Sequence, residues 1–201
     1  MYNAIRHNTE ENYQEDLAIM QAKFDQVIEA GVRQISILAD DAANVGGDNY
    51  IRMLEDMTDW IEEKQKKYPD LKLTLPFVTQ EYMYNGESYY QRFPDNVQIV
   101  MTGGRIWGEV SQNFTTTFTT NAGRGPYLWI NWPCTDNSKK HLIMGGYSNF
   151  LHPNVDPAKV EGIVLNPMQQ SEPSKVAIFG NAAYSWNIWE SEEVANQAWK
   201  D

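Results

Sequence analysis

Apolar side chains recur in the early part of the chain at the spacing of an amphipathic helix. They lie three or four positions apart, which places them on one helix face: Tyr13, Leu17, Met20, Phe24 and Val27. Asn8 or Thr9 precedes this run and Gly31 follows it, and these residue types suit the beginning and the end of a helix. The pattern therefore predicts a helix between these limits.

A short apolar run and a second amphipathic run come next. Ile35, Ile37 and Leu38 predict a buried strand that ends in two aspartates. Asp48 is then placed to cap a helix, and Pro69 lies beyond its end. The apolar face of this helix carries Ile51, Leu54, Met57 and Ile61.

The rest of the chain repeats this alternation of strands and helices. Further strands are predicted within 71–78, 96–102, 126–132 and 161–168, and further helices within 108–122, 171–189 and 191–199. A short strand is also expected at residues 1–6, and a long polar loop at 133–158. Strands that alternate with helices predict βαβ units and a mainly parallel sheet, so the expected fold class is α/β.

The composition and the net charge argue against several classes of binding partner and cofactor. The 201 residues carry a formal net charge of −11, which argues against nucleic acid and against an anionic membrane surface. The single cysteine, Cys134, excludes an internal disulfide and leaves no cysteine cluster for zinc. His7, His141 and His152 show no ligand spacing, and no glycine-rich phosphate loop follows the first strand. We therefore expect neither a metal nor a nucleotide cofactor.

Asp40 and Asp41, at the end of the first predicted strand, are the sharpest chemical signal. Like charges at close range do not both ionise readily, so one carboxyl can stay protonated while the other is an anion. An acid and an anion in one place are what glycoside cleavage requires. A solvated turn or a helix cap remains the alternative interpretation, and a metal site is less favoured because two carboxylates offer too few oxygens.

Trp129, Asn131 and Asp136 form a second group, on and just after the strand predicted at 126–132. Trp129 and Asn131 are two residues apart, so their side chains leave the same face of the strand. An aromatic plane beside amide and carboxylate groups is typical of a site for a pyranose ring. A core tryptophan beside a turn fits this pattern equally well.

Other polar residues are harder to interpret from the sequence. Tyr82 also fits a core position, and Asn166 fits a turn. Ser111, Ser148 and Cys134 lack the neighbours of a covalent nucleophile. Polar residues at strand ends are typical of a (β/α)8 barrel, but such a barrel normally needs about 250 residues.

Five segments then stand in a characteristic order. They read ISILADD, TQEYMY, VMTGGRIW, YLWINWPCTDN and VLNPMQQSEPSKVAIFGNAAYSWN. Over nearly all of the chain, this order and spacing resembles glycoside hydrolase family 84, the family of bacterial hyaluronidase-like β-N-acetylglucosaminidases and of the O-GlcNAcases. The resemblance implies a (β/α)8 TIM barrel. Residues 1–6 are similar to its third strand, so we expect residues 1–201 to form a single, N-terminally truncated catalytic barrel domain with about strands 3 to 8.

The resemblance also implies an activity, the removal of terminal β-linked N-acetylglucosamine with retention of configuration. The 2-acetamido carbonyl of the substrate attacks the anomeric carbon and forms an oxazoline. Asp40 would orient the acetamido N–H, and Asp41 would be the general acid and then the general base. The implied sugar contacts are Tyr82 and Trp129 at the acetamido pocket, Ile106 near the leaving group, Asn131 near the acetamido or glycosidic oxygen, Asp136 at O4 and O6, and Asn166 at a ring hydroxyl.

The expected partner is an N-acetylglucosamine-containing glycan or glycoprotein, and the family weakly favours a secreted bacterial location. Endo-cleavage of hyaluronan is an alternative that the acidic charge disfavours, and a non-catalytic sugar-binding fragment is another. The chain departs from the family at Met101, where a tryptophan is usual, and at Trp107, where an aliphatic residue is usual. We expect these differences to affect packing and the choice of leaving group.

Overall fold

The computed structural model describes residues 10–42, 44–136, 140–145 and 150–200, and the strand expected at residues 1–6 lies outside them. The described strands follow the order β1-β2-β3-β4-β5 in one sheet, and the pairings β1–β2, β3–β4 and β4–β5 are parallel. The predicted α/β class with a parallel sheet is confirmed. The chain divides into two compact units: unit 1 is Met1–Gln80 with Tyr89–Ile99, and unit 2 is Glu81–Ser88 with Val100–Asp201.

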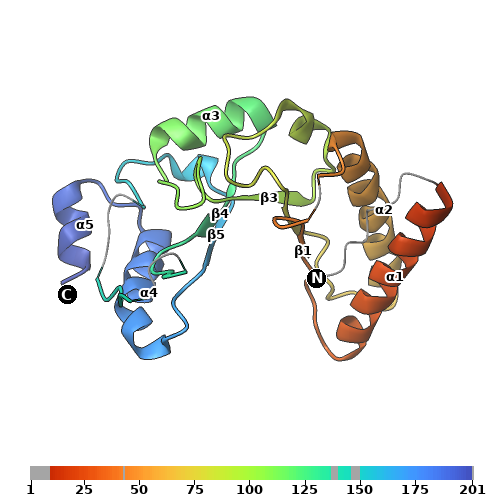
Figure 1. Ribbon diagram of the computed structural model, residues 1–201, viewed down its shortest axis with the longest axis horizontal. Helices are drawn as coiled ribbons and strands as arrows, with labels where there is room; N and C mark the ends of the chain where they lie inside the picture. Colours follow the sequence, from red (N-terminus) through yellow and green to blue (C-terminus); the bar gives the residue numbers. More distant parts are fainter. Residues whose placement is uncertain (1–9, 43, 137–139, 146–149, 201) are drawn as a thin grey trace. The chain divides into compact units, whose positions relative to one another are not determined.

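In the described part of unit 1, the α-helices α1 (Glu10–Glu29) and α2 (Gly47–Gln65) lie side by side (Figure 1). The hydroxyl of Tyr13 on α1 donates a hydrogen bond to the Asp56 carboxylate on α2 at 2.5 Å. Lys64 on α2 forms an ion pair with Asp25 on α1 at 2.5 Å. Both predicted helices are confirmed, and the predicted apolar face of α2 is buried: Ile51, Leu54, Met57 and Ile61.

Asp48 does not cap α2, which corrects the sequence prediction. Gly46 occupies the N-cap position with φ 84° and ψ 155°, and no side chain caps this end. That conformation favours glycine, and Gly47 is held against Tyr89, whose ring would lie 2.8 Å from an added Cβ. Asp48 lies in the first turn, where the helix dipole favours an acidic residue, and pairs with Arg92 at 2.7 Å.

The strands of unit 1 are shorter than the sequence predicts. β1 (Ile37–Leu38) pairs with β2 (Leu75–Val78), and Ile37 lies opposite Phe77. Ile35 is buried as expected, but Leu38 is 54% exposed. Successive side chains of a strand point to opposite faces, so Ile37 and Leu38 do not enter the same core. The prediction that all three residues are buried was therefore wrong for Leu38.

The boundary between the two units falls within β3 (Val97–Met101), because Ile99 belongs to unit 1 and Val100 to unit 2. Val100 and Met101 lie opposite the first residues of β4 (Tyr127–Ile130). β4 pairs along its whole length with β5 (Gly162–Leu165). The strands predicted within 96–102, 126–132 and 161–168 are thus confirmed with narrower limits.

The helix between β3 and β4 is α3 (Gln112–Ala122). It begins four residues after the start of the predicted range, 108–122, and ends where that range ends. The Ser111 hydroxyl accepts a hydrogen bond from the Phe114 N–H at 3.1 Å and caps the helix. Gly123 ends it in the left-handed conformation, with φ 73°. Two short 3-10 helices, η1 (Ser88–Arg92) and η2 (Pro157–Lys159), complete the connections.

Two further helices of unit 2 are α4 (Ser171–Trp186) and α5 (Glu192–Ala198). Both predicted helices are confirmed with narrower limits. Gly180 of α4 lies against Trp199, because a Cβ added at this glycine would lie 1.7 Å from the indole. The Trp189 ring packs edge-on against Tyr184 at 4.8 Å and against Trp199 at 5.5 Å. Within the described ranges, no helix is long and apolar enough to cross a membrane.

Candidate functional site

The residues proposed from the sequence fall at or after the carboxyl ends of strands. Asp40 and Asp41 follow β1 in unit 1. The other six residues all belong to unit 2: Tyr82, Ile106, Trp129, Asn131, Asp136 and Asn166. In the structure, Tyr82 and Trp129 form one pair. Ile106, Asn131, Asn166 and Asp136 are joined in a second group by hydrogen bonds, in part through Cys134. Asp40 and Asp41 have their own surroundings in unit 1.

Tyr82 and Trp129 form a stacked aromatic pair in unit 2. Their ring centroids lie 5.4 Å apart, with an angle of 18° between the ring planes. Thr102 fixes the backbone at Tyr82, because its N–H donates to the Tyr82 carbonyl at 3.0 Å. Tyr82 is buried, as a core residue would be, whereas Trp129 is half-buried.

Asn131, the first residue after β4, lies at the centre of a hydrogen-bond network. Its side-chain N–H donates to the Ile106 carbonyl at 2.7 Å, and its side-chain oxygen accepts from the Asn166 amide at 2.9 Å. Asn131 is 6% exposed. The side chain of Asn166 thus does more than a turn residue requires, since it joins the end of β5 to the end of β4.

Cys134 extends this network to Asp136. The Asn166 amide donates to the Cys134 sulfur at 3.6 Å, and the sulfur also has hydrogen bonds with Asp136 and with the Trp107 indole. Burial is the largest cause that raises the pKa of this thiol, and the nearby Asp136 carboxylate raises it further. We name Asn131, Cys134, Asp136 and Asn166 the amide–thiol cluster. The sequence did not indicate that Cys134 belongs to this cluster, because Asp136 is the one contact of Cys134 named here that is near it in sequence.

The Asp40–Asp41 turn is built on the β1–β2 ladder. The Ala39 N–H donates to the Val78 carbonyl at 2.9 Å, and the Ala42 N–H donates back to the Ala39 carbonyl at 3.1 Å. The Gln80 side chain donates to the Ala42 carbonyl at 2.8 Å. The turn is therefore fixed on both sides, and it holds Asp40 half-buried and Asp41 exposed.

The two carboxyls differ in environment, as the sequence interpretation expects for such a pair. Burial raises the pKa of Asp40, and the charge of Asp41 adds to this, against hydrogen bonds from the backbone N–H groups of both residues. The Oδ1 atom of Asp40 is shielded from solvent and accepts no hydrogen bond within the described structure. A shielded oxygen without a hydrogen-bond partner is unusual in folded proteins.

Metal binding has no support in the part of the chain that the structure describes, where no group of three or more His, Cys, Asp or Glu residues could hold an ion. Two cavities of unit 2 offer space for larger molecules. One, of about 540 Å³, borders the network described above, and its walls are Met83, Tyr84, Gly104, Arg105, Ile106 and Trp107.

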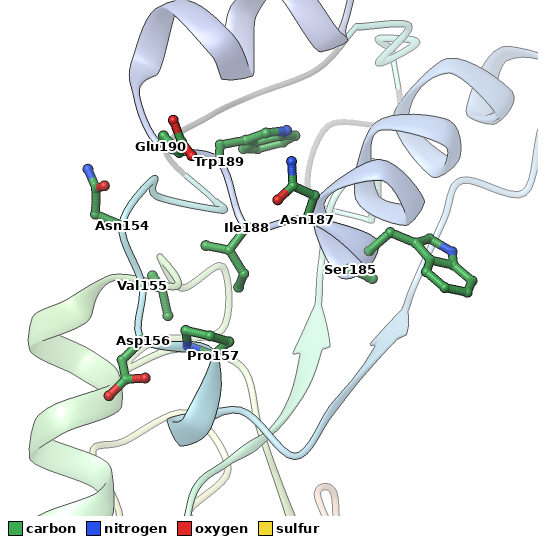
Figure 2. A pocket seen from close by; sticks show the side chains of 10 residues that line it. Asn154, Val155, Asp156, Pro157, Ser185, Asn187, Ile188, Trp189 and Glu190 are labelled. Atoms are coloured by element: carbon green, nitrogen blue, oxygen red, sulfur yellow. The ribbon is translucent and has the colours of Figure 1, made fainter.

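The second cavity, of about 500 Å³, lies between residues 154–157 and 185–190 (Figure 2). The Asn154 N–H donates to the Trp189 carbonyl at 2.8 Å and joins the two segments. Asp156 is engaged in capping η2 through the Ala158 N–H at 3.0 Å. None of the residues proposed from the sequence lines this cavity, so it does not enlarge the candidate site.

A parallel α/β sheet with aromatic, amide and carboxylate groups at its strand ends is the arrangement of an enzyme that binds its substrate at the carboxyl ends of the strands. A family model described as beta-N-acetylglucosaminidase matches residues 3–201. The chain belongs to this family, which is glycoside hydrolase family 84. The resemblance found in the sequence is confirmed.

Solved structures share the fold of this chain. CpGH84D is 33% identical, with a TM-score of 0.82 over 98% of this chain. CpGH84B is 24% identical, with a TM-score of 0.80 over 96% of this chain. A mutant of the Thermobaculum terrenum O-GlcNAc hydrolase is 22% identical, with a TM-score of 0.69 over 98% of this chain. The chain spans 33%, 36% and 44% of the length of these three proteins, respectively, which is less than half of each.

Proposed function

We propose that this chain supplies the catalytic carboxylates and most of the sugar contacts of a retaining β-N-acetylglucosaminidase. In the proposed reaction, the acetamido carbonyl oxygen of the substrate bonds to the anomeric carbon. The bond to the leaving oxygen breaks as Asp41 donates a proton to that oxygen. Asp41 then takes a proton from water, and the water oxygen opens the oxazoline with overall retention. Holding the nucleophile beside the anomeric carbon supplies the rate advantage of proximity.

Asp40 is proposed to accept a hydrogen bond from the acetamido N–H. The observation in support is its shielded Oδ1 atom, which accepts no hydrogen bond within the described structure. A donor placed there would stabilise the carboxylate, against the burial that raises the pKa of Asp40. The same contact would orient the acetamido group for attack.

The amide–thiol cluster and the Tyr82–Trp129 stack are the observation that carries the proposal. A pyranose needs an apolar surface for its ring face and polar groups for its hydroxyls. The stack is suited to the first need and to enclosing the acetamido methyl. Asn131, Asp136 and Asn166 are suited to the second, with Ile106 toward the leaving group.

The test compares two carboxylate variants on aryl N-acetylglucosaminides with leaving groups of increasing pKa. Asp41→Asn should slow substrates with poor leaving groups most, because they depend most on a general acid. Asp40→Asn should slow the whole series alike, because it disturbs the nucleophile. Asp59→Asn, at an exposed position on α2, is the matched control and should change nothing. Equal leaving-group slopes for the two active-site variants would contradict the assignment.

Sugar binding without hydrolysis is a second candidate, favoured by one observation. All six proposed sugar contacts belong to unit 2, whereas both carboxylates belong to unit 1. Titration with N-acetylglucosamine and with glucose, followed by the chemical shift of the Trp129 indole N–H, measures binding apart from turnover. Binding of N-acetylglucosamine with no turnover of any aryl glycoside would favour this second candidate.

A further inference from the structure

The last of the five characteristic segments ends in YSWN, and three residues of this motif line the cavity of about 500 Å³ in unit 2 (Figure 2). Tyr184, the first residue of the motif, is buried. Ser185, Trp186 and Asn187 are exposed along the cavity. None of these four residues has a part in the reaction proposed above, so the cavity is a separate feature of unit 2.

The buried part of the cavity wall is firmly held. Val155 and Trp189 are each 2% exposed. The Trp189 ring packs edge-on against Tyr184 and Trp199, at centroid distances of 4.8 and 5.5 Å. The Asn154 N–H donates to the Trp189 carbonyl at 2.8 Å and joins the two segments of the wall. The cavity is therefore formed without a ligand, which lowers the cost of ordering on binding.

Trp186, the last residue of α4, is 92% exposed. This is the highest value among the large apolar side chains that the structure describes. An indole that lies almost wholly in water offers a flat apolar face to a ligand. Single exposed apolar residues are common on protein surfaces, so the inference also depends on the polar groups that share the cavity with Trp186.

Those polar groups have unused hydrogen-bonding capacity. Three exposed side chains of the lining form no hydrogen bond or ion pair within the part of the chain that the structure describes: Asn154, Asn187 and Glu190. The Asp156 carboxylate accepts from the Ala158 N–H at 3.0 Å, and the Ser185 hydroxyl donates to the Asn181 carbonyl at 2.8 Å. Both groups keep oxygen lone pairs for a further bond. The cavity thus offers amide donors together with amide, carboxylate and hydroxyl acceptors.

This set of groups favours one class of ligand. An anion would meet the carboxylates of Asp156 and Glu190, and the described lining contains no Lys or Arg to balance them. A cation would suit the carboxylates and the indole, but it has no acceptor for the amide N–H groups. A sugar hydroxyl both donates and accepts, so a neutral pyranose can bond to the amides and the carboxylates while its apolar ring face covers an indole.

We propose that this cavity is a second carbohydrate site, which binds a neutral pyranose of a glycan chain. Trp186 lies against the ring face, and Asn154, Asn187 and Glu190 bond to the hydroxyls. The volume of about 500 Å³ is within the range of ligand pockets, about 300–1,000 Å³. The proposal does not depend on the proposed function, because none of the residues named for catalysis or sugar contact there lines this cavity. A site of this kind would hold a glycan or glycoprotein on the surface of unit 2.

The test follows the indole N–H of Trp186 and the methyl groups of Ile188, which also line the cavity, by NMR of the full chain. Four probes are titrated to millimolar concentration: cellotriose, N,N′,N″-triacetylchitotriose, a hyaluronan tetrasaccharide and choline. Chitotriose is used with Asp41→Asn, which removes the proposed general acid. We expect a neutral trisaccharide to shift both reporters and to bind on the order of tenfold more tightly than the hyaluronan fragment or choline.

Variants at exposed positions test which groups cause the binding. Trp186→Ala should weaken trisaccharide binding, read from Ile188, on the order of tenfold, and Trp186→Tyr should retain most of it because a ring face remains. Glu190→Gln removes the charge but keeps an acceptor, so it should leave sugar binding within about twofold of the wild type. Phe179→Ala is the matched control, because Phe179 is an aromatic residue of α4 outside the cavity and 60% exposed, and it should change nothing.

The outcomes separate this inference from the proposed function. If the trisaccharides shift the Trp129 indole N–H and leave Trp186 and Ile188 unchanged, the second site is overturned and the proposed function stands. If they shift Trp186 and Ile188 alone, the second site is supported and the result counts against the proposed function.

Three further results would overturn the second site. Choline that binds more tightly than either trisaccharide, together with loss of binding in Glu190→Gln, would show a cation site. Equal trisaccharide binding by the wild type and Trp186→Ala would remove the role of the indole. No shift of Trp186 or Ile188 with any probe would show that the cavity binds none of these ligands.

Discussion

Asn131→Ala should destabilise unit 2, because Asn131 holds two segments of it together. The substitution removes the hydrogen bonds to the Ile106 carbonyl and from the Asn166 amide, which measure 2.7 and 2.9 Å. Each lost bond is worth about 1 kcal/mol, and truncation of a buried side chain adds to this. Asn131 is 6% exposed, whereas Asn166 is half-buried and can bond to water instead. We therefore expect the free energy of unfolding to fall by about 2–3 kcal/mol.

Urea unfolding followed by indole fluorescence measures this change, because six of the seven tryptophans belong to unit 2. Asn187→Ala, at an exposed residue just after α4, is the matched control and should stay within about 0.5 kcal/mol of the wild type. The double variant with Asn166→Ala should lose about 1 kcal/mol less than the sum of the single variants, since they share one bond. A loss below about 0.5 kcal/mol for Asn131→Ala would refute this reasoning.

Three further predictions concern stability. The pKa of Asp40 is raised, so the native state keeps this proton at pH values where the unfolded chain has lost it. The wild type should therefore lose stability relative to Asp40→Asn as the pH rises above about 3.9. Urea unfolding midpoints of both proteins at pH 3.5 and 7 check this, and a difference that stays constant between the two pH values would contradict it. Gly180→Ala should lower the free energy of unfolding by about 2 kcal/mol or more, because the added methyl meets Trp199; an unchanged melting temperature would show that the indole moves freely. Ser111→Ala should cost about 1 kcal/mol through loss of the cap on α3, and Ser111→Asp should restore it.

The sequence predicted those features that depend on local periodicity. The apolar residues of α2 follow a helical spacing, and their burial is confirmed because the helix has one core-facing side. Trp129 lies on β4, and Asn131 directly follows the strand at the spacing of two that the sequence analysis used. Asn131 and the Tyr82–Trp129 stack both belong to unit 2. Their roles in catalysis and sugar binding stay predictions, as does the single truncated catalytic domain.

Features that depend on distant partners could not be predicted. Asp48 was expected to cap α2, but the backbone of Gly46 already provides the N-cap. Leu38 was expected to be buried because its side chain is apolar. Residue type alone does not tell on which face of β1 that side chain lies. Trp107 was recognised only as a departure from the family, and its contact with Cys134 became visible when the loops after β3 and β4 were placed in space.

Because Cys134 lies within the amide–thiol cluster, the reactivity of its thiol reports local opening of that cluster. The chain contains one cysteine, so any thiol reagent reads a single site. Burial raises the pKa of this thiol, and a neutral, enclosed thiol reacts slowly. Alkylation must therefore wait for the loop after β4 to separate from Asn166, and its rate relative to that of the unfolded chain gives the opening equilibrium. A molecule bound against Asn131, Asp136 and Asn166 would slow alkylation in proportion to its occupancy, whether or not any bond is cleaved.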